Sequence, residues 1–481
     1  MELIATLILA ALQEPERKPA PQQPRQEPAA DAAQAPAAPR GRALVFRVDR
    51  VETLEGDALH NATLVVRDGI IEKLGEAVVL PDKAQIHDLR GGSSTAMPPW
   101  VLAHGNFLAR DPRSSGRNGR FRAVDSLYLG EEDLPSLLAQ GILLVGVDPP
   151  GSGIPGRSSV IETTAEAPRP RALVNDLHLK LTIATDPAAV ELLRKALKDA
   201  DEAIEKEKKA RQDWEKARKD WEEKQKAKQE AEKKQQEQQK QEKEGEPPKA
   251  AQDGDKGQQQ KEEKAPPETF EPPPLDPDLK PVVEWVRKQR VAQIWVDDSG
   301  DWLHWLDVLG ERELAYEVIL SHSDQQNLQE VAPALGEKKL RVEAPARLSF
   351  LPFTRLRVNL PAELAAAGVR LVLSPPAPPP AGRPPGEAAA DMARGWRLGL
   401  ADLVREGLDR SAALRAVTME PAAGMGQEER VAPLKMGGPA TFIVLDGDPL
   451  DPTARVLYVV DRGEVRYDRA KALAKMEGAV R

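Results

Sequence analysis

The residues best suited to metal chemistry begin at a histidine that ends an apolar run. The segment Ala103-His104-Gly105-Asn106 places an imidazole and a side-chain amide two positions apart. On a strand, both side chains would point to the same face. An imidazole nitrogen binds divalent cations well, whereas an amide is a poor ligand for transition metals. We therefore expect one strong ligand where a complete site of this spacing would have two.

Composition limits the ligands and the partners. The chain has no cysteine, which excludes thiolate metal sites and disulfides, so any metal would use His, Asp, Glu or a modified Lys. The net charge of -9 makes nucleic acid an unsuitable partner, because nucleic-acid binding needs an excess of basic surface.

Eight short apolar runs alternate with helical stretches, a pattern typical of a parallel sheet. Eight such units predict a (β/α)8 barrel, an α/β fold in which chemistry occurs at the carboxyl ends of the strands. Several of these runs end in polar residues, including Asp148, Asp297 and Ser374. The runs are Pro99 to His104, Ile142 to Asp148, Ser159 to Thr163, Leu177 to Ala184, Val291 to Asp297, Tyr316 to His322, Leu340 to Ala344 and Val369 to Ser374.

Strand patterns also occur near both ends of the chain. Ala43 to Val48 and Ala62 to Arg67 are followed by a hairpin turn at Asp68-Gly69, and similar runs return after Ala440. We expect one small composite β-sandwich that the barrel interrupts. The predicted layout is a leader and linker at 1–40, sandwich at 41–95 and 427–470, barrel at 96–190 and 275–426, and an insertion at 191–274.

The insertion is highly charged. Residues 201–250 include 15 acidic and 15 basic side chains, and Lys, Glu, Gln, Ala and Arg favour helix. A solvated helix followed by a disordered low-complexity linker up to about Pro274 is the simpler interpretation. A coiled-coil arm that docks a partner is the alternative, although the heptad pattern is poorly sustained.

The first residues resemble an export signal. Leu3 to Leu12 is apolar but too short to span a bilayer, and a Pro/Ala/Gln-rich stretch follows from Glu14 to Arg40. The run lacks a basic start and an Ala-x-Ala cleavage site. We expect export to the periplasm or cell envelope, without a transmembrane span.

Three segments together resemble the amidohydrolase superfamily, in particular its imidazolonepropionase-like and dihydroorotase-like branch. They are Asn61-Ala-Thr-Leu-Val-Val-Arg-Asp-Gly-Ile-Ile, Ala96-Met-Pro-Pro-Trp-Val-Leu-Ala-His-Gly-Asn, and Ala413-Leu-Arg-Ala-Val-Thr-Met-Glu-Pro-Ala with the later Asp446-Gly-Asp-Pro-Leu-Asp. The resemblance implies a metal-dependent (β/α)8 barrel flanked by a composite β-sandwich. It covers about 43 to 470 except the charged insertion.

The resemblance also implies a degraded metal site. His104 matches the first of two histidines of the family, and Asn106 replaces the second. His322 matches the histidine of strand six, while that of strand five falls on Val296. Asp298 lies two residues beyond Val296, and Lys180 matches loosely a lysine that bridges two metals in some relatives. His104, His322, Asp298 and Lys180 are thus the candidate ligands of one weakly held Zn²⁺ or similar ion, and no other cofactor is expected.

The catalytic aspartate of the family falls on Pro376, which has no acid–base capacity. The family mechanism uses a metal-bound water and a proton shuttle, so we expect hydrolysis of non-peptide, cyclic-amide C–N bonds to be impaired or lost. No catalytic residue is assigned. The alternative is a non-catalytic envelope protein that binds or scaffolds through the barrel mouth or the charged arm. The expected partner is a small amide-type ligand or an envelope protein. His178, on the strand face of Lys180, is expected to be an ordinary polar strand residue.

Overall fold

The structure is a computed structural model, and it describes residues 41–109, 115–183, 187–242, 265–320, 327–379 and 382–479. The leader expected at residues 1–40 and the linker at 243–264 lie outside these ranges. Among the described residues, no helix is both long enough and apolar enough to cross a membrane.

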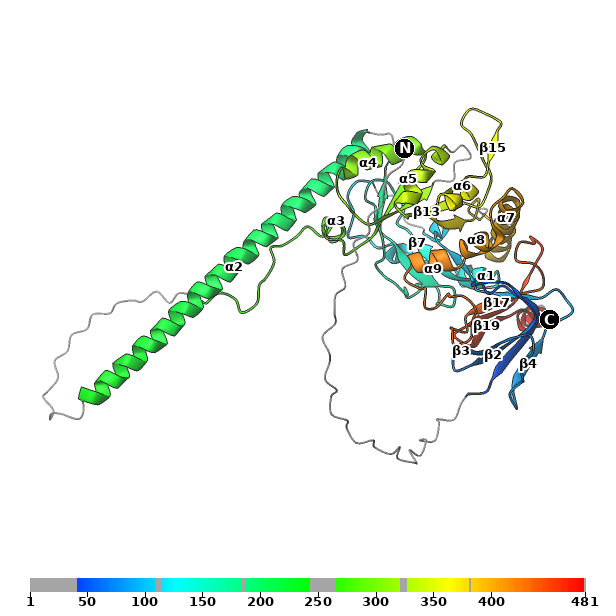
Figure 1. Ribbon diagram of the computed structural model, residues 1–481, viewed down its shortest axis with the longest axis horizontal. Coiled ribbons are helices and arrows are strands. Elements are labelled where there is room, and N and C mark those ends of the chain that lie inside the picture. Colours follow the sequence, from blue (N-terminus) through cyan, green and yellow to red (C-terminus); the bar gives the residue numbers. More distant parts are fainter. Residues whose placement is uncertain are drawn as a thin grey trace, which may run out of the picture. The chain divides into compact units, whose positions relative to one another are not determined.

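Strands from both ends of the chain form one eight-stranded sheet (Figure 1). Its order is β19-β18-β17-β5-β1-β2-β3, with β4 also paired to β1. Asp68 and Gly69 both have positive φ at the turn between β2 and β3, as a tight hairpin of this kind requires. The strands are β1 Leu44–Val51, β2 Leu59–Arg67, β3 Ile70–Gly75, β4 Gln85–Asp88, β5 Thr95–Met97, β17 Phe442–Leu445, β18 Val456–Asp461 and β19 Glu464–Asp468.

The eight middle runs all form strands, and seven of them run parallel to a neighbour. The parallel strands are β6 Trp100–Leu102, β7 Ile142–Val147, β10 Leu179–Thr182, β11 Ala292–Val296, β12 Tyr316–Leu320, β13 Arg341–Pro345 and β16 Arg370–Ser374. They belong to a six-stranded and a three-stranded sheet. Backbone hydrogen bonds from Val101 to Val417 and from Leu373 to Ala416, both 2.9 Å, bring β6 and β16 to the same connecting segment.

The prediction for the third barrel strand was wrong in direction. β9, Ser159–Glu162, pairs antiparallel with β7, and β8, Gly156–Arg157, pairs antiparallel with β10. Only residues 148–158 separate β7 from β9, and a parallel return needs a crossover of about a dozen or more residues. The glycines of this connection, Gly151, Gly153 and Gly156, all have positive φ, which lets the chain reverse within a short loop.

Short helices lie between the strands, and a longer helix, α7, follows β16. The helices are α1 Asp133–Leu138, α3 Lys280–Val286, α4 Ser299–Leu309, α5 Ala332–Glu337, α6 Leu360–Ala366, α7 Pro385–Arg405, α8 Arg410–Arg415, α9 Met419–Gly424 and α10 Arg469–Ala479, with 3-10 turns η1 Asn106–Leu108, η2 Ala123–Ser126 and η3 Leu328–Glu330. A two-stranded hairpin, β14 Ser349–Phe350 and β15 Arg357–Val358, follows β13.

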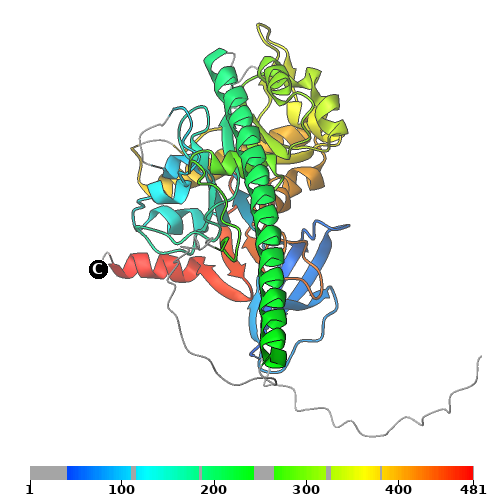
Figure 2. The same ribbon diagram turned by 90° about the vertical axis from the view of Figure 1, so that its left-hand side faces the viewer.

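The charged insertion forms one continuous helix, α2, from Pro187 to Glu242 (Figure 2). Near its start, Leu193, Leu197 and Ala200 are buried, and this part contacts α3 and α4. Further along, the indole of Trp214 donates a hydrogen bond of 3.0 Å to the carbonyl of Pro267. Apolar burial therefore holds the base of the helix, while its later residues are mostly exposed.

Candidate functional site

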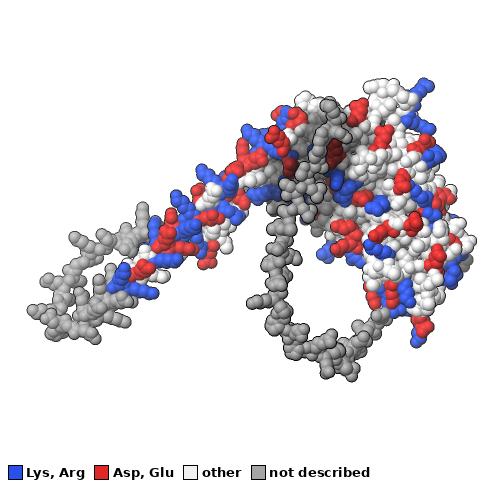
Figure 3. Space-filling view, viewed as in Figure 1, with Lys and Arg blue, Asp and Glu red and all other residues white. Residues whose placement is uncertain are grey.

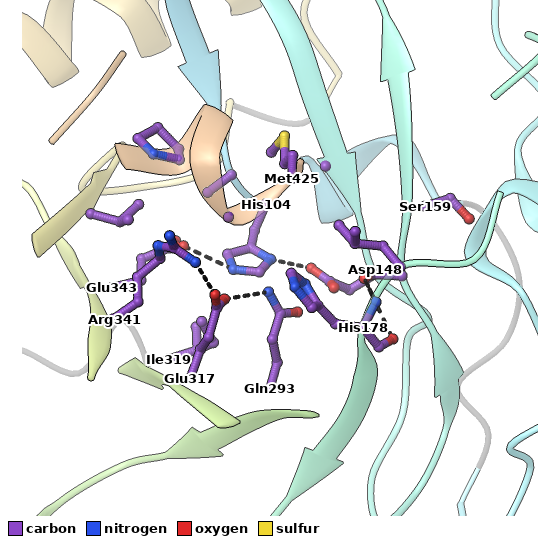
Figure 4. Close-up of a pocket in the computed structure, with 17 residues that line it drawn as sticks. His104, Asp148, Ser159, His178, Gln293, Glu317, Ile319, Arg341, Glu343 and Met425 are labelled. Carbon is purple, nitrogen blue, oxygen red and sulfur yellow. Dashed lines mark hydrogen bonds and ion pairs between the residues drawn. The ribbon is translucent and has the colours of Figure 1, made fainter. Parts of the chain in front are cut away.

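Charged and polar side chains from successive strands meet in a small buried cavity (Figure 4). The cavity has a volume of about 30 Å³. Its polar lining includes His104 after β6, Asp148 after β7, His178 before β10, Gln293 on β11, Glu317 on β12, and Arg341 and Glu343 on β13. Such a concentration of buried charge requires mutual pairing.

The strand register explains why these side chains converge. Lys180 lies opposite Gln293, which in turn lies opposite Glu317 on the next strand. Glu343 lies opposite Ile319. In parallel strands that surround a common interior, residues of equal register form one layer of inward-facing side chains. Lys180, Gln293 and Glu317 therefore form one row of polar side chains across three neighbouring strands.

His104 lies between two carboxylates. Its Nδ1 forms a very short contact with Asp148, and its Nε2 lies 2.8 Å from Oε2 of Glu343. Burial alone would lower the pKa of His104, but the charges of Asp148 and Glu343 outweigh it and raise the pKa to about 10. The same pairing keeps the pKa of Asp148 below its ordinary value in spite of its burial. His104 is therefore an imidazolium at neutral pH.

A second ion pair lies beside the first. The guanidinium of Arg341 contacts one oxygen of Glu317, and Nε2 of Gln293 lies 3.5 Å from the other oxygen. Figure 4 shows this pair adjoining the His104 cluster. The carboxylate of Glu317 is thus engaged by neighbours on both flanking strands.

Lys180 supplies a third buried cation. Its Nζ donates a hydrogen bond of 3.0 Å to the carbonyl of Pro149 and lies 4.2 Å from the centre of the Trp295 ring. The ring of His104 contacts the same tryptophan at 5.1 Å. With His104 and Arg341, Lys180 balances the three carboxylates of Asp148, Glu317 and Glu343.

His178 is more than the ordinary polar strand residue that the sequence suggested. It is buried in the cavity wall, and its backbone N–H donates a hydrogen bond of 3.0 Å to Oγ of Ser158. Burial lowers the pKa of His178, and this effect outweighs the opposing charges of Glu317 and Asp148. His178 is therefore neutral, so it leaves the charge balance of the cavity unchanged.

Three of the four candidate metal ligands lie within the described residues, and they do not form one group there. His104 and Lys180 both contact Trp295 in the interior. Asp298 instead caps the start of α4, where its side chain accepts the N–H of Asp301 at 3.0 Å. His322 lies outside the described residues. The side chain of Asn106 is also engaged, because its Oδ1 accepts a hydrogen bond of 3.2 Å from the N–H of Asp148.

These residues do not fit a catalytic metal ion. Both ring nitrogens of His104 face carboxylate oxygens, and a protonated ring nitrogen has no lone pair to donate. Val296, at the position of a family ligand, is a buried aliphatic residue. Within the ranges that the structure describes, no group of three or more His, Asp or Glu side chains is arranged to hold a metal.

A second, larger cavity lies at the carboxyl ends of the strands. We call it the mouth pocket, and its volume is about 320 Å³. His104 and Glu343 line both the mouth pocket and the smaller cavity described above. Its lining is mostly apolar, with a few polar groups. The apolar residues are Leu102, Phe107, Trp295, Ile319, Leu320, Pro375, Ala377, Pro378 and Met392, and the polar residues are His104, Asn106, Glu343 and Ser374.

Sequence reasoning missed Gln293, Glu317, Arg341 and Glu343 as site residues. The signal was present, because each of the four lies within or at the start of a short, otherwise apolar strand. A polar residue inside a strand buried on both faces must find a partner in the interior.

Comparisons with known proteins bear on the fold. No protein-family model matches the chain, and no curated protein matches it either. Among solved structures, an amidohydrolase from Thermotoga maritima MSB8 superposes with a TM-score of 0.61 at 19% identity, over 89% of this chain and 100% of that one. A beta-aspartyl dipeptidase from Fervidobacterium islandicum AW-1, in complex with a beta-Asp-Leu dipeptide, matches at a TM-score of 0.45 and 11% identity, over 89% and 97%.

The superposition on the Thermotoga structure is the comparison that establishes the fold class. The chain has an α/β fold shared with an amidohydrolase, which confirms the α/β class that the sequence predicted. At 19% identity the likeness establishes the fold and leaves activity to the residues of the site.

Proposed function

We propose that this chain is a divergent member of the amidohydrolase superfamily that has lost metal-dependent hydrolysis of C–N bonds and retains binding of a small amide-type molecule at the barrel mouth. The observation that carries the proposal is the double pairing of His104 with Asp148 and Glu343. This pairing occupies one of the two histidine ligands that the sequence keeps, His104 and His322.

Metal capture would have to undo that pairing. A metal ion at His104 would displace a proton and at least one of the two buried carboxylates. Breaking a buried ion pair by removing one partner typically costs about 3–5 kcal/mol. A metal bound there would also lack the proton shuttle, because Pro376 stands at the position of the family aspartate. Acid–base assistance of that kind is worth roughly 10²–10⁴-fold in rate.

The mouth pocket suits a small ligand with an apolar body. Ligand pockets typically have volumes of roughly 300–1,000 Å³ and combine apolar walls with a few polar groups, and this one is near the lower limit at about 320 Å³. Phe107, Trp295 and Met392 supply apolar walls. Asn106 and Glu343 also line the pocket. The NH₂ group of Asn106 and the second carboxylate oxygen of Glu343, which their pairing with Asp148 and His104 does not use, are the kinds of group that hydrogen-bond to an amide.

Elemental analysis and ligand binding test the proposal together. Protein dialysed against Zn²⁺ and then washed should retain far less than about one ion per chain, and chelator should leave its melting temperature unchanged. A panel of lactams, hydantoins and dipeptides should include compounds that raise the melting temperature without turnover. Met392→Arg should abolish that stabilisation by filling the pocket, while Met436→Arg, at an exposed position, should preserve it.

Two results would contradict the proposal. About one tightly bound Zn²⁺ per chain, lost together with turnover in His104→Ala, would show that the metal centre works. Absence of any binding across the panel, with Met392→Arg behaving as the parent protein, would leave the mouth pocket without the proposed role.

A further inference from the structure

The hairpin after β13 exposes an unusual amount of apolar surface. Phe353 is 99% exposed, Leu356 63% and Phe350 38%. All three belong to a ten-residue segment that runs from β14 through a tight turn to β15, near the label β15 in Figure 1. Large apolar groups gathered at one exposed place mark interaction sites more often than ordinary surface.

The charged residues of the segment that carries this tip are all basic. Between Glu343 and Glu363 the chain has no acidic residue and three arginines, Arg347, Arg355 and Arg357. Arg355 and Arg357 are exposed and form no ion pair within the described part of the chain. Figure 3 shows this end of the molecule as uncharged atoms with basic groups beside them. A protein of net charge -9 thus presents a basic and apolar tip.

The backbone holds the tip in place. The N–H of Leu351 donates to the carbonyl of Leu356, and the N–H of Thr354 donates to the carbonyl of Leu351, both at 3.0 Å. The hydroxyl of Thr354 adds a bond of 3.0 Å to the same carbonyl. Phe353 has φ of 60°, a left-handed conformation that is rare for a bulky residue. Strain of this kind persists where the surroundings over-determine the conformation, often for function.

We propose that this hairpin is an anchor for a bilayer surface that contains anionic lipid. Phe353 and Leu356 enter the boundary between headgroups and acyl chains, and Arg355 and Arg357 contact lipid phosphates. Stable attachment of a peripheral protein generally needs two signals, an apolar insertion and a basic patch. The hairpin carries both.

A lipid surface fits the tip better than a protein partner does. A stable protein interface uses roughly 20–30 residues on each side, whereas this tip comprises ten residues. A protruding aromatic side chain would also need a matching pocket on a protein. A fluid bilayer accepts it without one.

The anchor also relates to the mouth pocket. The N–H of Ala346, three residues before β14, donates 2.8 Å to the carbonyl of Ser374, which lines that pocket. The hairpin therefore leaves the barrel from its mouth end. Anchoring does not depend on ligand binding, so either proposal can fail alone.

The lack of cysteine allows a site-specific test with the full chain. Leu356→Cys is labelled with an environment-sensitive fluorophore and mixed with vesicles of phosphatidylcholine containing about one third phosphatidylglycerol. We expect a blue shift and quenching by lipid-borne quenchers at this site. Pure phosphatidylcholine should produce a much smaller change. Val79→Cys, 80% exposed on the loop between β3 and β4, is the matched control and should remain in water.

Variants without the label complete the test. Phe353→Ser with Leu356→Ser should weaken vesicle binding by at least about tenfold, and Arg355→Glu with Arg357→Glu should remove the preference for anionic lipid. Val79→Ser should change neither quantity, and circular dichroism checks that each variant is folded. A label at residue 356 that stays in water, with or without vesicle binding by the chain, would overturn the proposal. So would vesicle binding that is unchanged in the double serine variant.

Discussion

Two carboxylates flank the ring of His104, and this arrangement decides what the residue can do. In water a histidine has a pKa near 6.5 and is free to ligate a metal above that pH. Between Asp148 and Glu343 the charged form is favoured, although burial opposes it. His104, which the sequence predicts as a metal ligand, is therefore a buried cation.

The protonation of His104 is directly measurable. Because its pKa is raised to about 10 in the folded state, its contribution to stability is fully present below pH 6.5 and is lost as the pH rises through about 10. Nitrogen-15 chemical shifts of the histidine rings should show His104 protonated on both nitrogens at pH 8. His87, whose pKa burial lowers, is the internal control and should be neutral there. A neutral His104 ring at pH 8 would contradict the assignment.

At the scale of elements, local sequence and burial divide α2 into two parts. Its first turns are amphipathic, and Ala200 is fully buried where the helix contacts α3 and α4. Its later turns consist mostly of exposed charged residues and glutamine, which favour helix without needing a partner. Only the base of the helix should therefore contribute strongly to folding.

A charge scan along α2 tests this division. Ala200→Glu should destabilise the protein by about 2–4 kcal/mol, because it buries an unpaired carboxylate and overpacks the contact. Lys228→Glu, at an exposed position further along the helix, should change stability by less than about 0.5 kcal/mol. Urea unfolding followed by tryptophan fluorescence measures both. Equal effects at the two positions would show that the outer part of the helix also packs against something.

At the scale of the whole molecule, the terminal sheet and the strands of the interior are joined by buried charge. Arg430 contacts both oxygens of Asp461 on β18, at 3.0 and 2.7 Å, and also Glu162 on β9 at 2.8 Å. Arg430 and Asp461 are almost completely buried. Despite its burial, the pKa of Arg430 is raised by Asp461 and Glu162. A single guanidinium thus links two sheets that lie far apart in sequence.

Removal of this link should affect the whole molecule. Arg430→Met leaves buried carboxylate charge without a partner and should cost about 3–5 kcal/mol. Calorimetry should show a lower melting temperature, and the sheet and the interior should still unfold together. Arg455→Met is the control, since its side chain is 63% exposed beside Asp446 and such pairs are worth at most about 1 kcal/mol. A melting temperature for Arg430→Met equal to that of the control would refute this role.

The sequence by itself determined the strands and the family of folds. Each predicted run became a strand because apolar content and turn residues act over a few neighbouring positions, as at Asp68-Gly69. Asp298 was expected as a metal ligand and is instead the N-cap of α4, where its side chain accepts the N–H of Asp301. The motifs around His104 predicted the α/β fold that the chain shares with the Thermotoga amidohydrolase.

Only the tertiary structure decided the direction of β9 and the chemistry around His104. The connection before β9 is too short for a parallel return, but only the folded sheet shows that β9 pairs with β7. The partners of His104, Asp148 and Glu343, are far from it in the sequence. Whether a histidine ligates a metal or carries a buried proton depends on the charges that surround it in space, because pairing energy in a dry interior acts over a few ångströms regardless of distance along the chain.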